Sequence, residues 1–229
     1  PYTNYWGKYS YKQEGCHFNS GYSESKMINA TRYALNKHNL NDVLVAGLDE
    51  TSIDTTISSV NKLSEEALNN LGRIDTHTYG GTKRAELRSL AQSKGKDLWM
   101  SEVDGSYKAG EDAGYMTAGL GLANQIIKDM NGLMPSAWVL WDIVDCHRDN
   151  TTPYRTESEA QTEISQTGGI WGVAMADHDA KDIVLTKKYY SFGQFTRYIE
   201  PGMTIIASGD NSLAAYDKNS GKTVIVAVN

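Results

Sequence analysis

The chain has 229 residues, of which 40% are hydrophobic and 22% are charged, an ordinary balance for a globular protein. Its net charge of −6 argues against a nucleic-acid partner, because proteins that bind nucleic acid carry basic patches. No apolar run reaches the roughly 20 residues of a membrane-spanning helix, so we expect no membrane partner either.

Amphipathic helices and apolar strands alternate along the first part of the chain. A helix is predicted over residues 23–38, with an apolar face made of Met27, Ala30, Thr31, Ala34 and Leu35. An apolar strand is predicted over 42–51. Residues 51–54, "TSID", resemble a helix-opening capping box, and the stripe that follows comprises Ile53, Ile57, Val60, Ala67, Leu68 and Leu71.

The same alternation continues to about residue 200. Strands are predicted at 73–81, 97–105 and 137–145, and helices at 82–94, from 116 to about 132, and at 186–199. A long polar loop is predicted over 146–168, and a short extended piece over 169–177. After Pro201, the stretches "MTIIAS", "SLAAYD" and "KTVIVAVN" predict an antiparallel β unit.

Nearly continuous apolar strands between amphipathic helices indicate an α/β fold with a parallel sheet. Two architectures fit this order, an open doubly wound sheet and a (β/α)8 barrel. An open sheet usually carries a glycine-rich phosphate loop after an early strand, and none is present here. A barrel places its catalytic groups where the strands end. The predicted strand ends carry Asp49 and Glu50, His77 and Tyr79, Glu102 and Asp104, and Trp141 and Asp142.

Glu102 ends the strand in "DLWMSEVDG", at residues 97–105. Burying a carboxylate is costly, so a role at a pocket mouth would explain one there. Glycoside hydrolysis needs two carboxylates beside the scissile bond, and His77 and Tyr79 could donate to one that stays ionised. Glu102 alone is as well explained as a solvated strand end. Together with His77 and Tyr79 it favours catalysis.

The two cysteines, Cys16 and Cys146, could form a bridge, but free, buried cysteines are the favoured interpretation. The chain opens on Pro1 and shows no signal peptide, so we expect a piece of a longer or processed protein. The histidines have no metal-ligand spacing, and we therefore expect no metal and no cofactor. The 14 tyrosines and 5 tryptophans suit a wet, sugar-binding surface, although any single ring is equally well explained as core.

Four stretches together resemble glycoside hydrolase family 30, most of all its endo-β-1,6-galactanase branch. They are "KQEGCHF" (12–18), "GLDETSID" (47–54), "THTYGG" (76–81) and "LWMSEVDG" (98–105), and "YYSFGQFTRYIEPGM" (189–203) is similar to the family's last barrel helix. The resemblance implies that residues 1–200 are the C-terminal half of a (β/α)8 TIM barrel, from the loop after strand four to helix eight. Residues 201–229 would then begin an antiparallel β-sandwich side domain.

The resemblance also implies an activity, a retaining endo-glycoside hydrolase acting on a β-linked polysaccharide, most of all β-1,6-galactan. Glu102 would be the nucleophile, and the acid/base glutamate would lie just before Pro1. The piece alone would then be inactive, with the missing N-terminal half of the barrel as a partner. The protein would be secreted or held at the cell surface. The alternative is a non-catalytic carbohydrate-binding protein on the same scaffold, while the missing phosphate loop disfavours an oxidoreductase.

The remaining rim residues are expected to bind substrate. Trp6 would stack on a sugar ring, with loop packing as an equal alternative, and Glu14 would structure a loop or bind sugar. Asp49 and Glu50 would bind hydroxyl groups, with a plain charged strand end as the alternative. Trp141 resembles a subsite floor more than a core residue.

Overall fold

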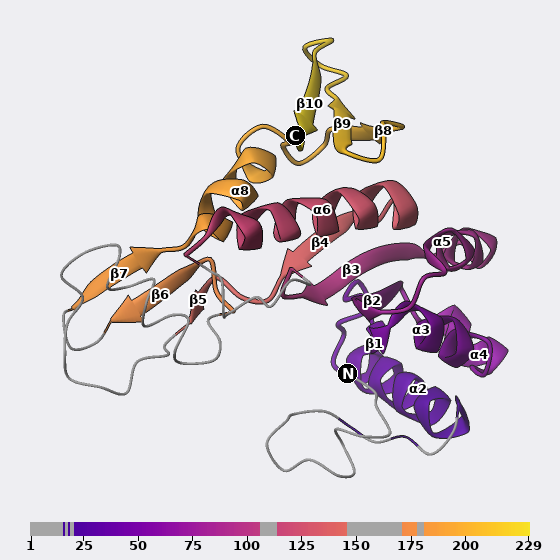
Figure 1. Cartoon of the computed structure of the whole chain (residues 1–229). Coiled ribbons are helices and arrows are strands. Elements are labelled where there is room, and N and C mark those ends of the chain that lie inside the picture. The colour runs from indigo at the N-terminus through magenta and orange to yellow at the C-terminus, as the bar shows by residue number, and fades with distance from the viewer. Residues whose placement is uncertain (1–15, 17, 19–20, 106–113, 146–170, 178–180) are drawn as a thin grey trace. The chain divides into compact units, whose positions relative to one another are not determined.

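A computed structural model describes residues 16, 18, 21–105, 114–145, 171–177 and 181–229 (Figure 1). The chain divides into two compact units. The first runs to Glu102 and includes Gly132–Val139, and the second comprises Val103–Asn131 and Leu140–Asn229.

The first unit contains a four-stranded sheet in the order β1-β2-β3-β4. These strands are β1 (Ala46–Ser52), β2 (Arg73–Gly80), β3 (Asp97–Val103) and β4 (Ala137–Leu140). β1 and β3 both pair with β2 in parallel. Helix α2 (Gly21–Lys37) precedes β1, and the helices between the strands are α3 (Ile53–Val60), α4 (Glu65–Asn70) and α5 (Arg84–Ser93). The predicted α/β fold with a parallel sheet is confirmed.

The core of the first unit lies between the sheet and its helices. Helix α3 packs on β1 and β2, and Ile53 and Val60 are fully buried there together with Ile74 of β2. Ser52 caps α3, since its side chain accepts a hydrogen bond from the Thr55 amide at 3.2 Å. The helix therefore starts within the predicted stretch 51–54, with Ser52 as its cap, whereas Thr51, the first residue of the predicted capping box, belongs to β1.

Two details of the predicted helices are wrong. The apolar stripe after residue 53 belongs to two helices, because Ser64 caps a separate helix, α4. Helix α2 buries Gly21, Glu24, Ser25 and Ile28, whereas Met27 is 54% exposed. Close packing against Lys62 and Ser64 explains why this face of α2 is buried. A Cβ at Gly21 would lie 2.4 Å from the Lys62 carbonyl oxygen, and Ser25 accepts a hydrogen bond from the Ser64 amide.

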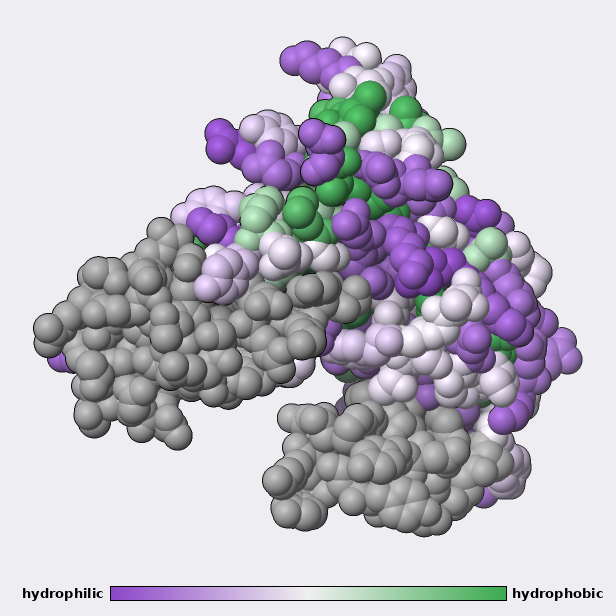
Figure 2. All heavy atoms as spheres, in the orientation of Figure 1, coloured by the Kyte–Doolittle hydropathy of each residue, from purple (hydrophilic) through white to green (hydrophobic). Residues whose placement is uncertain are grey.

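The second unit contains two helices and six short strands among its described residues. They are α6 (Met116–Leu133, whose last residues belong to the first unit), β5 (Val144–Asp145), β6 (Ala174–Asp177), β7 (Asp182–Leu185), α8 (Lys187–Thr196), β8 (Thr204–Ile206), β9 (Ser212–Tyr216) and β10 (Thr223–Ala227). Within this unit, hydrophobic residues gather over α6 and β8–β10 (Figure 2).

The strands of the second unit form two sheets. β5 pairs with β6 in parallel and β6 with β7 antiparallel. β8, β9 and β10 form an antiparallel sheet in the order β10-β9-β8, as predicted for the segment after Pro201. Strand β7 was not predicted, and the strand predicted over 137–145 is divided between β4 and β5, which join different sheets. Helix α6 contacts β9 through Asn131, whose side-chain amide donates a hydrogen bond to the Ser212 carbonyl at 3.0 Å.

Cys16 is free and exposed, which corrects the expectation of a buried cysteine. It lies ahead of α2, outside the helices and longer strands whose inner faces form the core. Cys146 lies outside the described residues. Among those residues, no helix is long and apolar enough to cross a membrane.

Candidate active site

Strand β2 presents polar side chains on one face. Alternate residues of a strand point to the same side, so Asp75, His77 and Tyr79 share a face. Thr76 lies on the opposite face, where its hydroxyl is 2.7 Å from that of Thr56 in α3. This buried contact fixes the helix side of β2. The other face is thereby left to His77 and Tyr79.

Two β-bulges bring residues of the neighbouring strands to the same face. In β1, the pairing moves from Leu48↔Asp75 to Glu50↔Thr76, which leaves Asp49 as an extra residue. In β3, the pairing moves from Thr76↔Met100 to His77↔Glu102, which leaves Ser101 as an extra residue. A bulge reverses the alternation after it and redirects side chains. Glu102 therefore lies opposite His77.

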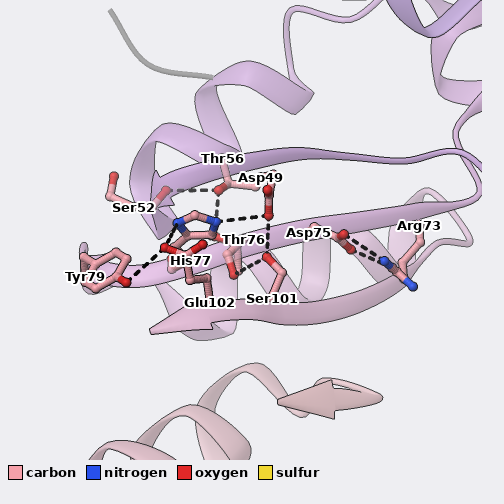
Figure 3. A network of polar contacts seen from close by, with 10 residues as sticks. All are labelled: Asp49, Ser52, Thr56, Arg73, Asp75, Thr76, His77, Tyr79, Ser101 and Glu102. Carbon is pink, nitrogen blue, oxygen red and sulfur yellow. Dashed lines mark hydrogen bonds and ion pairs between the residues drawn. The ribbon is translucent and has the colours of Figure 1, made fainter. Parts of the chain in front are cut away.

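Glu102 receives one hydrogen bond in this arrangement and faces a buried imidazole (Figure 3). The Tyr79 hydroxyl donates a hydrogen bond to Oε1 of Glu102 at 3.0 Å. Nδ1 of His77 lies 3.6 Å from the same oxygen. The Glu102 side chain is 35% exposed, while that of His77 is 1% exposed. Glu102 thus combines a fixed orientation with access for a ligand.

Asp49 holds the other side of the His77 ring. Its Oδ1 lies 3.1 Å from Nε2 of His77 and accepts a hydrogen bond from the Ser101 hydroxyl at 2.6 Å (Figure 3). Partial burial raises the pKa of Asp49. The hydrogen bonds from His77 and Ser101 and the charge of the ring outweigh burial and lower this pKa to about 2. Asp49 is consequently ionised at any ordinary pH.

An ion pair lies on the same face of β2, nearer the start of the strand. Arg73 contacts both carboxylate oxygens of Asp75, at 2.6 and 2.9 Å, and its guanidinium carbon lies 3.5 Å from the centre of the Trp99 ring. Burial raises the pKa of Asp75, and the charge and hydrogen bonds of Arg73 oppose that rise. Arg73 and Asp75 therefore neutralise each other's charge on the face of β2 that carries His77 and Tyr79.

Glu50 does not lie at the rim, so its predicted role in binding hydroxyl groups is corrected. The bulge at Asp49 turns Glu50 to the helix side of the sheet, where it is fully buried and accepts a hydrogen bond from Ser59 of α3 at 2.5 Å. Burial raises its pKa to about 8, and the nearby Glu24 carboxylate adds to the rise, while Ser59 opposes it. Adjacent residues of β1 therefore serve opposite faces.

Three further residues were predicted to bind substrate. Trp141 belongs to the second unit, is 44% exposed, and lies 6.3 Å from Trp171 between ring centres. Trp6 and Glu14 lie outside the described residues. In the described part of the chain, no group of three or more His, Cys, Asp or Glu side chains is placed to hold a metal ion.

Sequence reasoning missed Ser101, which follows the buried Met100 and was passed over as part of a strand. The only signal was its place directly before Glu102, and β3 carries no glycine that would mark the bulge. Asp49 was predicted at the strand end, but its contact with His77 was not predicted. Both contacts depend on the bulges, which the pattern of a single strand does not predict.

The predicted resemblance is confirmed by comparison with known proteins, although no family model matches the chain. An endo-β-1,6-galactanase of Hypocrea rufa is 31% identical over 221 residues, covering 95% of this chain and 39% of that protein. An exo-β-1,6-galactobiohydrolase of Bifidobacterium longum is 24% identical over 256 residues, covering 98% and 16% respectively. This chain therefore spans less than half of the length of either relative.

The fold is similar to that of solved glycoside hydrolase family 30 structures. The catalytic domain of xylanase C from Talaromyces cellulolyticus matches with a TM-score of 0.68 and 18% identity, covering 97% of this chain and 47% of that one. At this identity the likeness concerns the fold alone.

Proposed function

We propose that this chain is part of a retaining endo-glycoside hydrolase resembling family 30, and that Glu102 is its nucleophile. The observation that carries the proposal is the contact of Glu102 with Tyr79 and His77. Both approach Oε1, at 3.0 and 3.6 Å. Within the described residues, Oε2 has no hydrogen bond, so this oxygen is available to attack an anomeric carbon.

The proposed reaction has two steps. In the first, Oε2 of Glu102 bonds to the anomeric carbon while the glycosidic C–O bond breaks, and a second carboxylic acid protonates the departing oxygen. In the second, that group, now a base, takes a proton from water, whose oxygen replaces Glu102 at the anomeric carbon. The hydroxyl of Tyr79 fixes the rotamer of Glu102 and stabilises the ionised carboxylate that begins each cycle.

The second carboxylate is proposed to lie immediately before Pro1, at the end of the fourth strand of a (β/α)8 barrel. Residues 1–200 would be the second half of that barrel, and residues 201–229 the start of a β-sandwich. Exposed apolar side chains support this. Val43 and Leu44 in the first unit and Ile183 in the second are 45%, 64% and 58% exposed, and further protein would cover them. A retaining enzyme would hold its two carboxyl groups about 5 to 5.5 Å apart.

The proposed substrate is β-1,6-galactan, on the basis of the two relatives named for β-1,6-galactan chemistry. Polysaccharides do not cross membranes, and we therefore propose that the protein acts outside the cell. Trp141, Trp6 and Glu14 remain proposed substrate-binding residues, and no metal or cofactor is part of the proposal.

Activity of the full-length protein on polysaccharides tests the proposal. We expect reducing ends to be released from β-1,6-galactan, and not from β-1,4-galactan or β-1,4-xylan. Glu102→Gln keeps the shape of the side chain and removes the nucleophile, so activity should fall about 10³-fold or more. Glu66→Gln, which alters an exposed glutamate of α4, is the matched control and should retain full activity.

Two results would count against the proposal. Tight binding of β-1,6-galactan by a wild-type protein with no hydrolysis of any β-glycan would favour a carbohydrate-binding protein. Hydrolysis that survives Glu102→Gln would move the nucleophile to another residue.

A further inference from the structure

We infer that Asp49 is a positioning residue, which holds the Nε2 proton of His77 and thereby presents the other ring nitrogen, Nδ1, to Glu102. This inference rests on the proposed function, in which Glu102 is the nucleophile. This role differs from the expected one of binding sugar hydroxyls, because Oδ1 of Asp49 accepts hydrogen bonds from His77 and Ser101.

The geometry around Asp49 commits its Oδ1 to the ring. Ser101 donates to this oxygen at 2.6 Å and His77 approaches it at 3.1 Å. Asp49 and Ser101 are the two bulged residues, one on each side of β2. Asp49 also has φ of 61°, in the left-handed region that residues other than glycine seldom adopt. The bulges in β1 and β3 thus bring Asp49 and Ser101 into hydrogen-bonding contact with each other.

An ionised carboxylate accepts hydrogen bonds and does not donate them, so the nitrogen facing Asp49 carries the proton. A neutral ring then has a bare Nδ1, which is buried and has no hydrogen-bond partner among the described residues. This lone pair would face Oε1 of Glu102 at 3.6 Å. The contact with Asp49 therefore fixes both the proton and the orientation of the ring, and it presents a defined edge of the imidazole to Oε1 of Glu102.

Other titratable groups around the ring have defined places. On β2, Tyr79 lies in an edge-to-face arrangement with His77 and donates to Glu102, and Asp75 is paired with Arg73. β1 contributes Asp49, and β3 contributes Glu102. Helix α3 meets this part of β2 through the hydroxyl of Thr56 on the far face. Asp49 is the ionised group in hydrogen-bonding contact with Nε2.

The kinetic constants of the full-length protein on β-1,6-galactan test this assignment. Asp49→Asn keeps the size of the side chain, but its amide can donate as well as accept and so no longer fixes the proton of His77 on Nε2. We expect kcat to fall about 10-fold or more with KM little changed, because Asp49 orients the ring beside the nucleophile. Ser101→Ala leaves the Asp49 carboxylate against Nε2 and should lower kcat less. Glu66→Gln controls for the loss of one negative charge.

A second measurement does not depend on activity. In protein labelled with ¹⁵N at histidine, we expect the neutral His77 ring to carry its proton on Nε2. A neutral ring with its proton on Nδ1, or an unchanged kcat in Asp49→Asn, would overturn the inference. A wild-type protein that hydrolyses no β-glycan would contradict the proposed function instead, and the tautomer of His77 would still test the role of Asp49.

Discussion

At the scale of single residues, the end of β1 carries two adjacent carboxyl groups with opposite pKa shifts. Asp49 accepts hydrogen bonds from Ser101 and His77, and these lower its pKa to about 2. Burial raises the pKa of Glu50 to about 8, against a usual value of 4.5. The difference follows from the faces they occupy. Asp49 meets donors at the site, and Glu50 enters the interior beside Ser59 and Glu24.

We predict that Glu50 makes the protein less stable as the pH rises. Between its unfolded pKa near 4.5 and its folded pKa of about 8, the folded state binds more protons, so the free energy of unfolding falls as pH increases. Glu50→Gln cannot ionise and should remove this loss, which amounts to a few kcal/mol at about pH 9. Thermal unfolding of the full-length protein at pH 5 and pH 9 measures it.

Glu66→Gln is again the control, because Glu66 is exposed and its replacement should not change the pH dependence. If Glu50→Gln and wild type lost the same stability between the two pH values, Glu50 would not be the buried group responsible.

At the scale of elements, the start of α5 is set by contacts between the loop after β2 and α3. Asp54 accepts hydrogen bonds from the amides of Thr82 and Lys83 at 3.1 and 3.3 Å. Gly81 fits closely against it, with φ of 88°, and an added Cβ would lie 2.9 Å from the Asp54 amide nitrogen. This loop directly follows Tyr79, so its path determines where the tyrosine hydroxyl lies.

We predict that Gly81→Ala destabilises the folded protein more than Gly95→Ala does. Gly95 also has a positive φ, of 63°, but nothing lies within 4 Å of an added Cβ. Gly95→Ala should therefore lower the free energy of unfolding only by the cost of a left-handed backbone at alanine, roughly 1–2 kcal/mol. Gly81→Ala should cost more in thermal unfolding and should also lower kcat, because Tyr79 shifts. Equal losses of stability in the two variants would contradict the close packing at Gly81.

The cap of α3 provides another test at this scale. Ser52→Ala removes the acceptor for the Thr55 amide and should cost about 1 kcal/mol in unfolding free energy. Ser89 lies in the middle of α5 and is exposed, and its hydroxyl donates a hydrogen bond to the Ala85 carbonyl. Ser89→Ala should leave stability unchanged or slightly higher. A Ser52→Ala protein as stable as Ser89→Ala would show that the cap does not stabilise α3.

Local patterns predicted most elements but not the bulges. Periodicity and end signals located β2, α5, β3 and α8, because each is bounded by glycine, proline or a change of period. Residues at the ends of predicted strands were all assigned to the rim. This placed Glu50 beside Asp49 although adjacent residues of a strand face opposite sides, and the placement of Glu50 was wrong. The pairing of three strands decides where a bulge forms, and because that information is not local, Ser101 was missed.

At the scale of the whole molecule, the chain covers 39% of the length of its Hypocrea rufa relative, and apolar side chains such as Leu44 and Ile143 are 64% exposed. We predict that residues 1–229 alone bind a hydrophobic dye, unfold without a sharp transition, and hydrolyse no galactan. The full-length protein should bind little dye and unfold cooperatively. A sharply unfolding, active fragment would contradict the proposed half barrel.

The central claim, that Glu102 becomes covalently bonded to the sugar, is tested most directly by trapping that bond. A 2-deoxy-2-fluoro-β-galactoside with a good leaving group should accumulate on the full-length protein, because fluorine slows hydrolysis of the intermediate. Cleavage after Lys96 and Lys108 releases residues 97–108, and mass spectrometry should find the adduct on Glu102. An adduct on Asp104 or any other residue, or turnover of the galactoside with inversion at the anomeric carbon, would contradict the claim.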